Sequence, residues 1–358
     1  MILLHVIETL SPYGGTPRKL LMLAREIDRT EHRMEIVGAM PGGLEAQFHS
    51  LNCVVHVAET SHPWSMSRLI HQRLASRKRP DVVLTHFRRA LLSSVVVASK
   101  VPIINNVHVT SDMKGWRGRV ARSLILRTRG IVCNSRFTAD RTASWIGGSS
   151  PVCVVLNPVA PRIDTDQGLC SILDDPGPLI THVGGLIAQR DHGTLIDGFA
   201  RLTTRWPMAR MAIVGEGPSR SDLLRLIDRY ELADRVFLLG YRDDVGALLR
   251  QSDVYVNPTI DEGFGIAVVE AMLSGVPVVL SQSGAHPELV SRGRFGLMFP
   301  ERDSRKMADA IDRLLRSPEL SRVLAERARR SAKVRFSPEI FTSRYLTAVS
   351  RLTAPEHR

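Results

Sequence analysis

Short apolar runs alternate with segments of helical periodicity along most of the chain. The first six runs predict strands at residues 2–7, 34–37, 82–84, 103–107, 131–133 and 152–156. Five more runs predict strands at 179–183, 211–214, 236–239, 254–256 and 276–280. Segments such as PRKLLMLAREID (17–28) lie between them and repeat apolar residues every three to four positions, as an amphipathic helix does. The alternation predicts an α/β protein with parallel sheets and helices on both faces.

The pattern is interrupted at residues 157–178. This stretch contains three prolines before Gly177 and has no clear period, so we interpret it as a linker. The length of 358 residues agrees with two domains, because one domain averages about 150 residues. Each half predicts a doubly wound sheet, in which ligands bind at the carboxyl ends of the strands.

Basic residues are concentrated in the first half. Residues 1–160 contain 21 Lys and Arg against 10 Asp and Glu, whereas residues 161–358 contain 27 against 26. Such asymmetry indicates an anionic partner for the first half. A basic nucleic-acid-binding protein is disfavoured, since aromatic residues make up only 5% of the chain and no platform for base stacking is evident.

The most basic segment extends from residue 113 to residue 139 and contains no acidic residue. Its basic residues are Lys114, Arg117, Arg119, Arg122, Arg127, Arg129 and Arg136. On a helix, one side would carry Trp116, Val120, Leu124 and Arg127. This composition suits a surface helix lying on an anionic membrane surface, and the alternative is an arginine-rich face in water.

The sequence shows no targeting or membrane-spanning segment. Residues 1–15 lack a basic leader, and no apolar stretch reaches the roughly 20 residues that a spanning helix requires. The four cysteines show no metal-ligand spacing and are expected to be reduced thiols. We therefore expect a cytoplasmic protein, held peripherally by its basic segment at the inner face of the cytoplasmic membrane.

Two acidic residues flank the start of an apolar helix in NPTIDEGFGIAVVEAMLSGVPVV (257–279). Glu262 and Glu270 lie eight positions apart, with a predicted turn at 262–265 and a predicted helix from 266 to 273. The free N–H groups of a first helical turn suit a phosphate or sugar hydroxyls. A carboxylate among apolar residues needs a polar ligand or a buried partner. A ligand site and a structural cap with an ion pair both fit this pattern.

The same stretch resembles the E-x7-E signature of family 4 of the retaining glycosyltransferases, also called glycosyl transferases group 1, which have the GT-B fold. SQSGAHPELVSRGRFGLMF (281–299), MAIVGEGPSRSDL and RVFLLGYRDDVGALLRQSDVYVNPT resemble neighbouring stretches of that family. YGGTPRKLLMLA, NVHVTSD and IVCNSRFTAD fit its N-terminal half. The resemblance is strong from about 179 to 335 and weaker from 1 to 158.

The resemblance implies two Rossmann-like domains facing across a cleft. The first, at 1–160, would bind the acceptor, and the second, at 179–335, would bind a nucleotide-sugar. A C-terminal helix at 336–358 is expected to pack back on the first domain.

The resemblance also implies roles for individual residues. Glu270 would bind the ribose hydroxyls of the nucleotide, and Glu262 would bind the donor sugar together with the backbone at 263–265. His108 would reach the same sugar from the other domain. The donor-binding set is Gly14, Gly15, Gly263, Phe264, Gly265 and Glu270, and the catalytic set is His108, Glu262 and Arg190.

The sequence departs from the family pattern in THVGGLIAQRDHGTL, after the first strand of the second half. Members of the family have an arginine and then a lysine here, which grip the diphosphate. Gly185 stands in place of the arginine, and Arg190 stands in place of the lysine. Arg190 keeps the charge but changes the geometry, so one phosphate contact is expected to be missing.

These observations predict a retaining glycosyltransferase that moves a hexose-type sugar from a UDP- or GDP-sugar. The acceptor would be lipid-linked or a saccharide, in bacterial polysaccharide or glycolipid synthesis. No metal or other cofactor is expected, because the resemblance implies that protein groups hold the diphosphate. A nucleotide-sugar epimerase of the same fold is the alternative.

Overall fold

The computed structural model describes the chain except residues 13, 59, 61, 99, 109–114, 162–175 and 355–358. The chain divides into two compact units. The first consists of Met1–Pro158 with Ser337–Arg358, and the second consists of Val159–Phe336. Most of the linker predicted at 157–178 lies outside the described residues.

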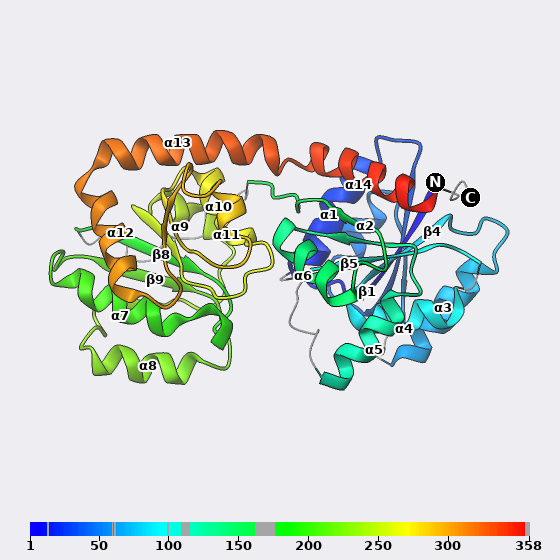
Figure 1. Cartoon of the computed structure of the whole chain (residues 1–358), viewed down its shortest axis with the longest axis horizontal. Helices are drawn as coiled ribbons and strands as arrows, with labels where there is room; N and C mark the ends of the chain where they lie inside the picture. Colours follow the sequence, from blue (N-terminus) through cyan, green and yellow to red (C-terminus); the bar gives the residue numbers. More distant parts are fainter. Residues whose placement is uncertain are drawn as a thin grey trace. The chain divides into compact units, whose positions relative to one another are not determined.

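The described residues of the first unit form a seven-stranded parallel sheet in the order β3-β2-β1-β4-β5-β6-β7 (Figure 1). Its strands are β1 Ile2–Thr9, β2 Arg33–Met40, β3 Val54–Val57, β4 Val82–His86, β5 Ile103–Val107, β6 Gly130–Cys133 and β7 Val152–Val154. Its helices are α1 Gly15–Ile27, α2 Glu45–His49, α3 Pro63–Leu74, α4 Phe87–Val97, α5 Gly115–Ile125, α6 Arg136–Ile146 and α14 Pro338–Thr353.

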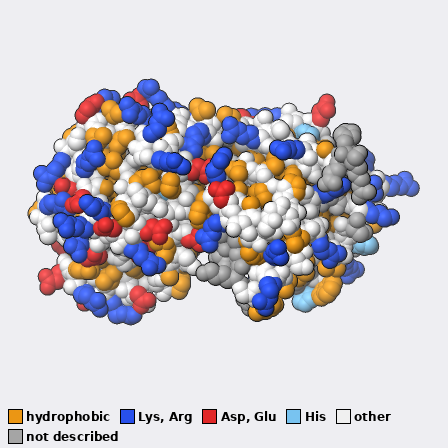
Figure 2. Space-filling view, in the orientation of Figure 1, with side chains coloured by type: hydrophobic (Ala, Val, Ile, Leu, Met, Phe, Trp, Pro, Cys, Tyr) orange, Lys and Arg blue, Asp and Glu red, His pale blue; other side chains and the backbone are white. Residues whose placement is uncertain are grey.

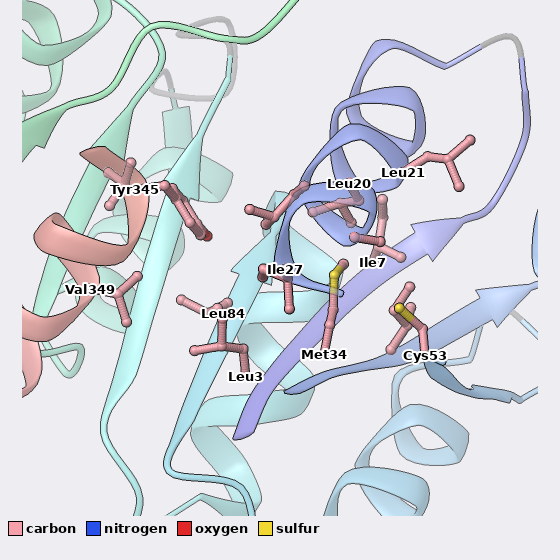
Figure 3. Close-up of a cluster of buried hydrophobic side chains, with 14 of the residues drawn as sticks. Leu3, Ile7, Leu20, Leu21, Ile27, Met34, Cys53, Leu84, Tyr345 and Val349 are labelled. Carbon is pink, nitrogen blue, oxygen red and sulfur yellow. The ribbon is translucent and has the colours of Figure 1, made fainter. Parts of the chain in front are cut away.

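The inner strand β1 is buried on both faces, and its alternate residues enter two different cores. Leu3 and Ile7 pack with α1 and α14, whereas Leu4 and Val6 pack with α3, α4 and α6. Figure 3 shows the first of these cores, in which Tyr345 and Val349 of α14 complete an apolar cluster with α1 and β1. The last helix of the chain is therefore part of the core of the first unit.

The described residues of the second unit form a six-stranded parallel sheet in the order β10-β9-β8-β11-β12-β13. Its strands are β8 Leu179–Val183, β9 Arg210–Val214, β10 Val236–Leu238, β11 Val254–Asn257, β12 Val278–Ser281 and β13 Leu297–Phe299. Its helices are the 3-10 helix η3 Ala188–Arg190, α7 His192–Thr203, α8 Arg220–Arg229, α9 Val245–Arg250, α10 Ile266–Ser274, α11 His286–Leu289, α12 Ser304–Arg316 and α13 Pro318–Arg335.

Both sheets have the strand order of a Rossmann fold, so the predicted fold class of two doubly wound domains is confirmed. All eleven predicted runs overlap strands. Two strands were not predicted, β3 and β13, and each lies at an edge of its sheet.

The surface of the second unit carries acidic and basic side chains side by side, whereas few acidic side chains appear on the first unit in the same view (Figure 2). In the basic segment, α5 exposes Trp116 by 65% and Val120 by 44%. Arg122, however, donates to the carbonyl oxygens of Trp145 (3.1 Å) and Ile146 (3.3 Å) at the end of α6. The guanidinium of Arg122 therefore caps a neighbouring helix, a contact that was not predicted.

None of the helices in the described part of the chain is long and apolar enough to cross a membrane.

Candidate active site

The topological switch point of the second sheet lies between β8 and β11. The chain continues from β8 toward one edge of the sheet and from β11 toward the other. In open parallel sheets of this topology, ligands bind at the loops that follow these two strands. Arg190 ends η3 after β8, and Glu262 lies in the loop after β11.

Arg190 and Glu262 form an ion pair at this switch point, although 72 positions separate them. Nη1 of Arg190 donates to Oε2 of Glu262 and, at 3.3 Å, to Oγ1 of Thr259. The side chains are 27% and 10% exposed, respectively, so the pair is largely removed from water. Two predicted catalytic residues are thus brought together, and each serves as the other's counter-ion.

Backbone contacts hold this loop rigidly. The N–H of Ile260 donates to the carbonyl of Gln189 (3.0 Å), which joins the loop after β11 to the loop after β8. The carbonyl of Glu262 accepts from the N–H of Ala285 (2.8 Å). Gly284 has φ +56°, and a Cβ there would lie 2.3 Å from the Glu262 carbonyl oxygen. Only glycine fits at this contact, so the position of Glu262 depends on it.

Helix α10 begins beside the ion pair without a side-chain cap. Gly265 precedes it at φ +94°, a conformation that favours glycine. The first turn therefore directs N–H groups and the positive end of the helix dipole toward the switch point. Glu270 is buried on the same helix, with 7% exposure.

Phe264 contributes its backbone to this region, whereas its ring is part of the core. The ring is 3% exposed and packs edge to face on Phe336, with 5.7 Å between ring centroids. Gly263, like its neighbours, is buried. Contact between a ligand and residues 263–265 would therefore involve main-chain groups.

Gly185 lies in the loop after β8, where the sequence predicts a missing phosphate contact. Its φ is not positive, and an added Cβ would meet only the carbonyl oxygen of Glu216, at 3.7 Å. A side chain can therefore begin at this position without backbone strain or a clash at its Cβ. We expect Gly185→Arg to tighten binding of the nucleoside diphosphate about tenfold, because a guanidinium adds charged hydrogen bonds.

Gly185→Gln is the matched control, since it adds a comparable side chain without charge. Titration calorimetry with the nucleoside diphosphate would measure both variants against the parent protein. If Gly185→Arg and Gly185→Gln bind the nucleoside diphosphate equally more tightly, or if Gly185→Arg alone binds it more weakly, the idea of a missing phosphate contact is contradicted.

The switch point of the first sheet lies between β1 and β4. Gly14 is the N-cap residue of α1 at φ −85°, and Gly15 is the first residue of that helix. No side-chain hydrogen bond caps this helix either. Both glycines thus lie where the sequence places them, at a helix start near the carboxyl end of β1.

His108 follows β5 and is the third ring in a row of histidines. Its Nε2 lies 3.0 Å from Nδ1 of His86, and Nε2 of His86 lies 3.0 Å from Nδ1 of His5. Adjacent rings are stacked with centroids 5.3 Å apart in both pairs. Sequence reasoning identified His108 but missed the other two, which lie on β4 and β1.

Burial and charge keep this row neutral. Desolvation, and then the positive charge of Lys19, lower the pKa of His5 to about 3 and the pKa values of His86 and His108 well below 6.5. Lys19 is itself buried, and desolvation lowers its pKa to about 7. None of the three imidazoles is expected to be charged at neutral pH.

A pocket opens beside His108 in the first unit. It is lined mainly by apolar side chains, among them Leu91, Val107 and Ile125. Phe87 lies at this pocket with φ +70°, and its ring is 5.4 Å from that of His108. A positive φ at a bulky residue is strained, and such strain concentrates at functional sites.

No group of three or more His, Cys, Asp and Glu side chains among the described residues is arranged to hold a metal ion.

Two family models match the chain, and together they cover both units. The model described as "Glycosyl transferases group 1" matches residues 171–331, and "Glycosyltransferase Family 4" matches residues 13–162. The chain is a group 1 glycosyltransferase.

Curated relatives of this glycosyltransferase act in bacterial glycoside synthesis, according to their names. The N-acetyl-alpha-D-glucosaminyl L-malate synthase of Bacillus anthracis is 25% identical over 290 residues, which cover 76% of this chain and 75% of that protein. The lipopolysaccharide core biosynthesis glycosyltransferase LpsE of Rhizobium meliloti is 27% identical over 279 residues, which cover 77% of each chain.

Solved structures show that the glycosyltransferase has the GT-B fold. Anabaena HepE in complex with UDP superposes with a TM-score of 0.82 and 20% identity, covering 98% of this chain and all of that one. A glycosyltransferase from Rickettsia africae superposes with a TM-score of 0.83 and 16% identity, covering 98% of both.

Proposed function

We propose that this glycosyltransferase moves a hexose-type sugar from a nucleoside-diphosphate donor to a lipid-linked or saccharide acceptor, with retention of configuration. The ion pair of Arg190 and Glu262 at the switch point of the second sheet carries the proposal. It supplies a cation for a diphosphate and a carboxylate for sugar hydroxyls at one place. UDP-sugars are the first donors to test, because HepE was solved with UDP and UDP-glucose, and GDP-sugars are the second.

The chemistry requires stabilisation of a diphosphate leaving group. Arg190 and the N-terminus of α10 would oppose its negative charge, and Glu270 would accept hydrogen bonds from the ribose. The acceptor hydroxyl attacks the anomeric carbon on the face from which the diphosphate departs. The bond between that carbon and the phosphate oxygen breaks, and the departing phosphate takes the hydroxyl proton. No protein nucleophile is assigned to this step.

A donor screen tests the proposal. Thermal shift and nucleotide release would be measured with UDP-, GDP- and ADP-sugars, with and without lipid-linked and saccharide acceptors. Glu270→Ala tests the proposed binding mode. It is expected to weaken nucleotide binding by about 1–3 kcal/mol, because charged hydrogen bonds to the ribose are lost. A protein that binds none of these donors, or a Glu270→Ala variant that binds its donor normally, would refute the proposal.

We also propose that the first unit docks on the inner face of the cytoplasmic membrane through α5 and the residues after it. Trp116 and Val120 supply exposed apolar area, and Arg119 and Arg127 are exposed basic residues nearby. Each arginine near an anionic surface contributes on the order of 1 kcal/mol.

The double variant Arg119→Glu and Arg127→Glu is expected to bind anionic vesicles at least about tenfold more weakly. Flotation on phosphatidylglycerol vesicles measures this, and high salt should weaken the parent protein similarly. Arg305→Glu with Arg327→Glu, two exposed positions of the second unit, is the matched control. Equal flotation on phosphatidylcholine vesicles would contradict electrostatic docking.

A further inference from the structure

The histidine row crosses three neighbouring strands diagonally toward the carboxyl edge of the first sheet. His5 of β1 pairs with Leu84 of β4, two residues before His86. His86 in turn pairs with Asn106 of β5, two residues before His108. Each step therefore moves one strand across and two residues up, so that side chains on the same face come into contact. The row leads from the interior of the unit to His108 at the pocket.

Each ring of the row is expected to be neutral at neutral pH and then carries one N–H and one bare nitrogen. Two directions of hydrogen bonding are then open. Either every ring donates from Nδ1 toward His108, or every ring donates from Nε2 toward His5. The two directions place the proton of His108 on different nitrogens.

The buried end of the row decides between these directions. Nε2 of His5 is buried and has no hydrogen-bond partner among the residues that the structure describes. If the rings donated toward His5, this nitrogen would be a buried N–H without an acceptor, which is rare and costly in proteins. If they donate toward His108, it is a bare nitrogen.

In two histidines of the second unit, the hydrogen-bond partner shows directly which ring nitrogen carries the proton. Nδ1 of His182 lies 2.9 Å from the carbonyl oxygen of Val256, and Nδ1 of His286 lies 3.1 Å from that of Ser281. A carbonyl oxygen can only accept, so both rings carry their proton on Nδ1. Within the described part of the chain their Nε2 atoms are buried without a partner, as in His5. In both histidines whose tautomer is fixed by a carbonyl partner, the buried Nε2 is therefore the nitrogen without a proton.

We propose that His5 and His86 are positioning residues that hold His108 in its Nδ1–H tautomer. His5 donates from Nδ1 to Nε2 of His86, and His86 donates from Nδ1 to Nε2 of His108. Within the described part of the chain no group is bonded to Nδ1 of His108, so its N–H is available to an oxygen of the substrate. This role for the N–H rests on the proposed function and on the family resemblance, which implies that His108 reaches the donor sugar.

The end of the row is anchored by α14. The ring of Tyr345 stacks on His5, with 6.1 Å between centroids, and its hydroxyl donates to Oδ1 of Asn106 at 3.0 Å. The stacking of Tyr345 on His5 and its hydrogen bond to Asn106 of β5 leave the imidazoles little freedom to rotate. The packing of the unit therefore fixes which ring nitrogens face each other along the row.

Nitrogen-15 NMR of histidine-labelled protein tests the tautomers without a substrate. Signals of the row would be assigned by their loss in His5→Gln, His86→Gln and His108→Gln. We expect protonated-type shifts at Nδ1 and bare-type shifts at Nε2 in all three rings. A proton on Nε2 of His108 or of His5 would overturn the proposal, whatever the protein catalyses.

Kinetics of two replacements of His86 test the function of the row. His86→Leu removes the donor to His108 and is expected to lower kcat about 10- to 100-fold, with an unchanged Kd for the nucleotide. His86→Asn keeps an N–H at the place of Nδ1 and should restore kcat to within about threefold of the parent. His56→Leu, a half-buried histidine of β3 outside the row, is the control.

Equal kcat values for the parent, His86→Leu and His86→Asn would overturn a positioning role. If His86→Leu does not fold, the NMR measurement on the parent protein still decides the tautomer. If no sugar is transferred from any donor, the proposed function fails, while the tautomer result stands on its own.

Discussion

Replacing Arg190 with alanine is expected to lower kcat/KM for sugar transfer about 100- to 1000-fold. Removal of one preorganised donor to a developing negative charge typically has this effect, about 2.7–4 kcal/mol. No arginine stands at position 185 to share the task, so the loss should fall at the upper end of the range. Steady-state kinetics with the preferred donor would measure it.

Arg190→Lys is the matched control for this prediction. It keeps the positive charge and restores the residue that the family pattern has at this position, but it removes the bidentate geometry. Because the positive charge is kept, Arg190→Lys should retain much more activity than Arg190→Ala. An Arg190→Ala protein with unchanged kcat/KM would show that the guanidinium serves Glu262 and Thr259 alone, as a structural contact.

Replacing Glu262 with glutamine is expected to lower kcat about 10- to 100-fold, the scale of a lost charged hydrogen bond. The side chain keeps its shape, so the loop that Gly284 and Ala285 support should remain in place. The Kd of the nucleoside diphosphate should stay the same or decrease, because Arg190 loses the carboxylate that competes with phosphate. Measuring kcat by steady-state kinetics and Kd by calorimetry on the same preparation separates the effect on turnover from the effect on binding.

The opposite pattern would contradict a role for Glu262 at the donor sugar. A variant with normal kcat and a lowered melting temperature would show that the ion pair stabilises the loop and nothing more. Glu216→Gln provides the comparison, because its partly exposed pair with Arg220 (3.2 Å) lies on the loop after β9 in the same unit. That change should affect kcat little.

The alternation of apolar runs predicted both sheets because buried parallel strands are nearly continuous in apolar residues. Strands β3 and β13 lacked this signal. Val54 of β3 is 47% exposed, and β13 contains only three residues, of which two are half-buried. Edge strands bury less surface and so leave a weaker pattern in the sequence.

The part of the candidate site that lies within one continuous segment, around Glu262 and Glu270, was predicted from the sequence. The contacts across the sheets were not predicted. His5 and His86 are 81 positions apart, and they meet only because β1 and β4 are neighbours in the strand order. A histidine within an apolar run has no local feature that reveals such a partner. The hydrogen bonds of Arg122 were not predicted for the same reason, because its acceptors lie on another helix.

The position of α14 has a consequence for the order in which the chain can fold during synthesis. Residues 159–336 are continuous, so the second unit can close its core as soon as they leave the ribosome. At that moment the first unit still lacks Phe341, Tyr345 and Val349, and the apolar face of α1 is uncovered. The half that is translated first is thus completed last, and its histidine row is anchored only when the final helix arrives.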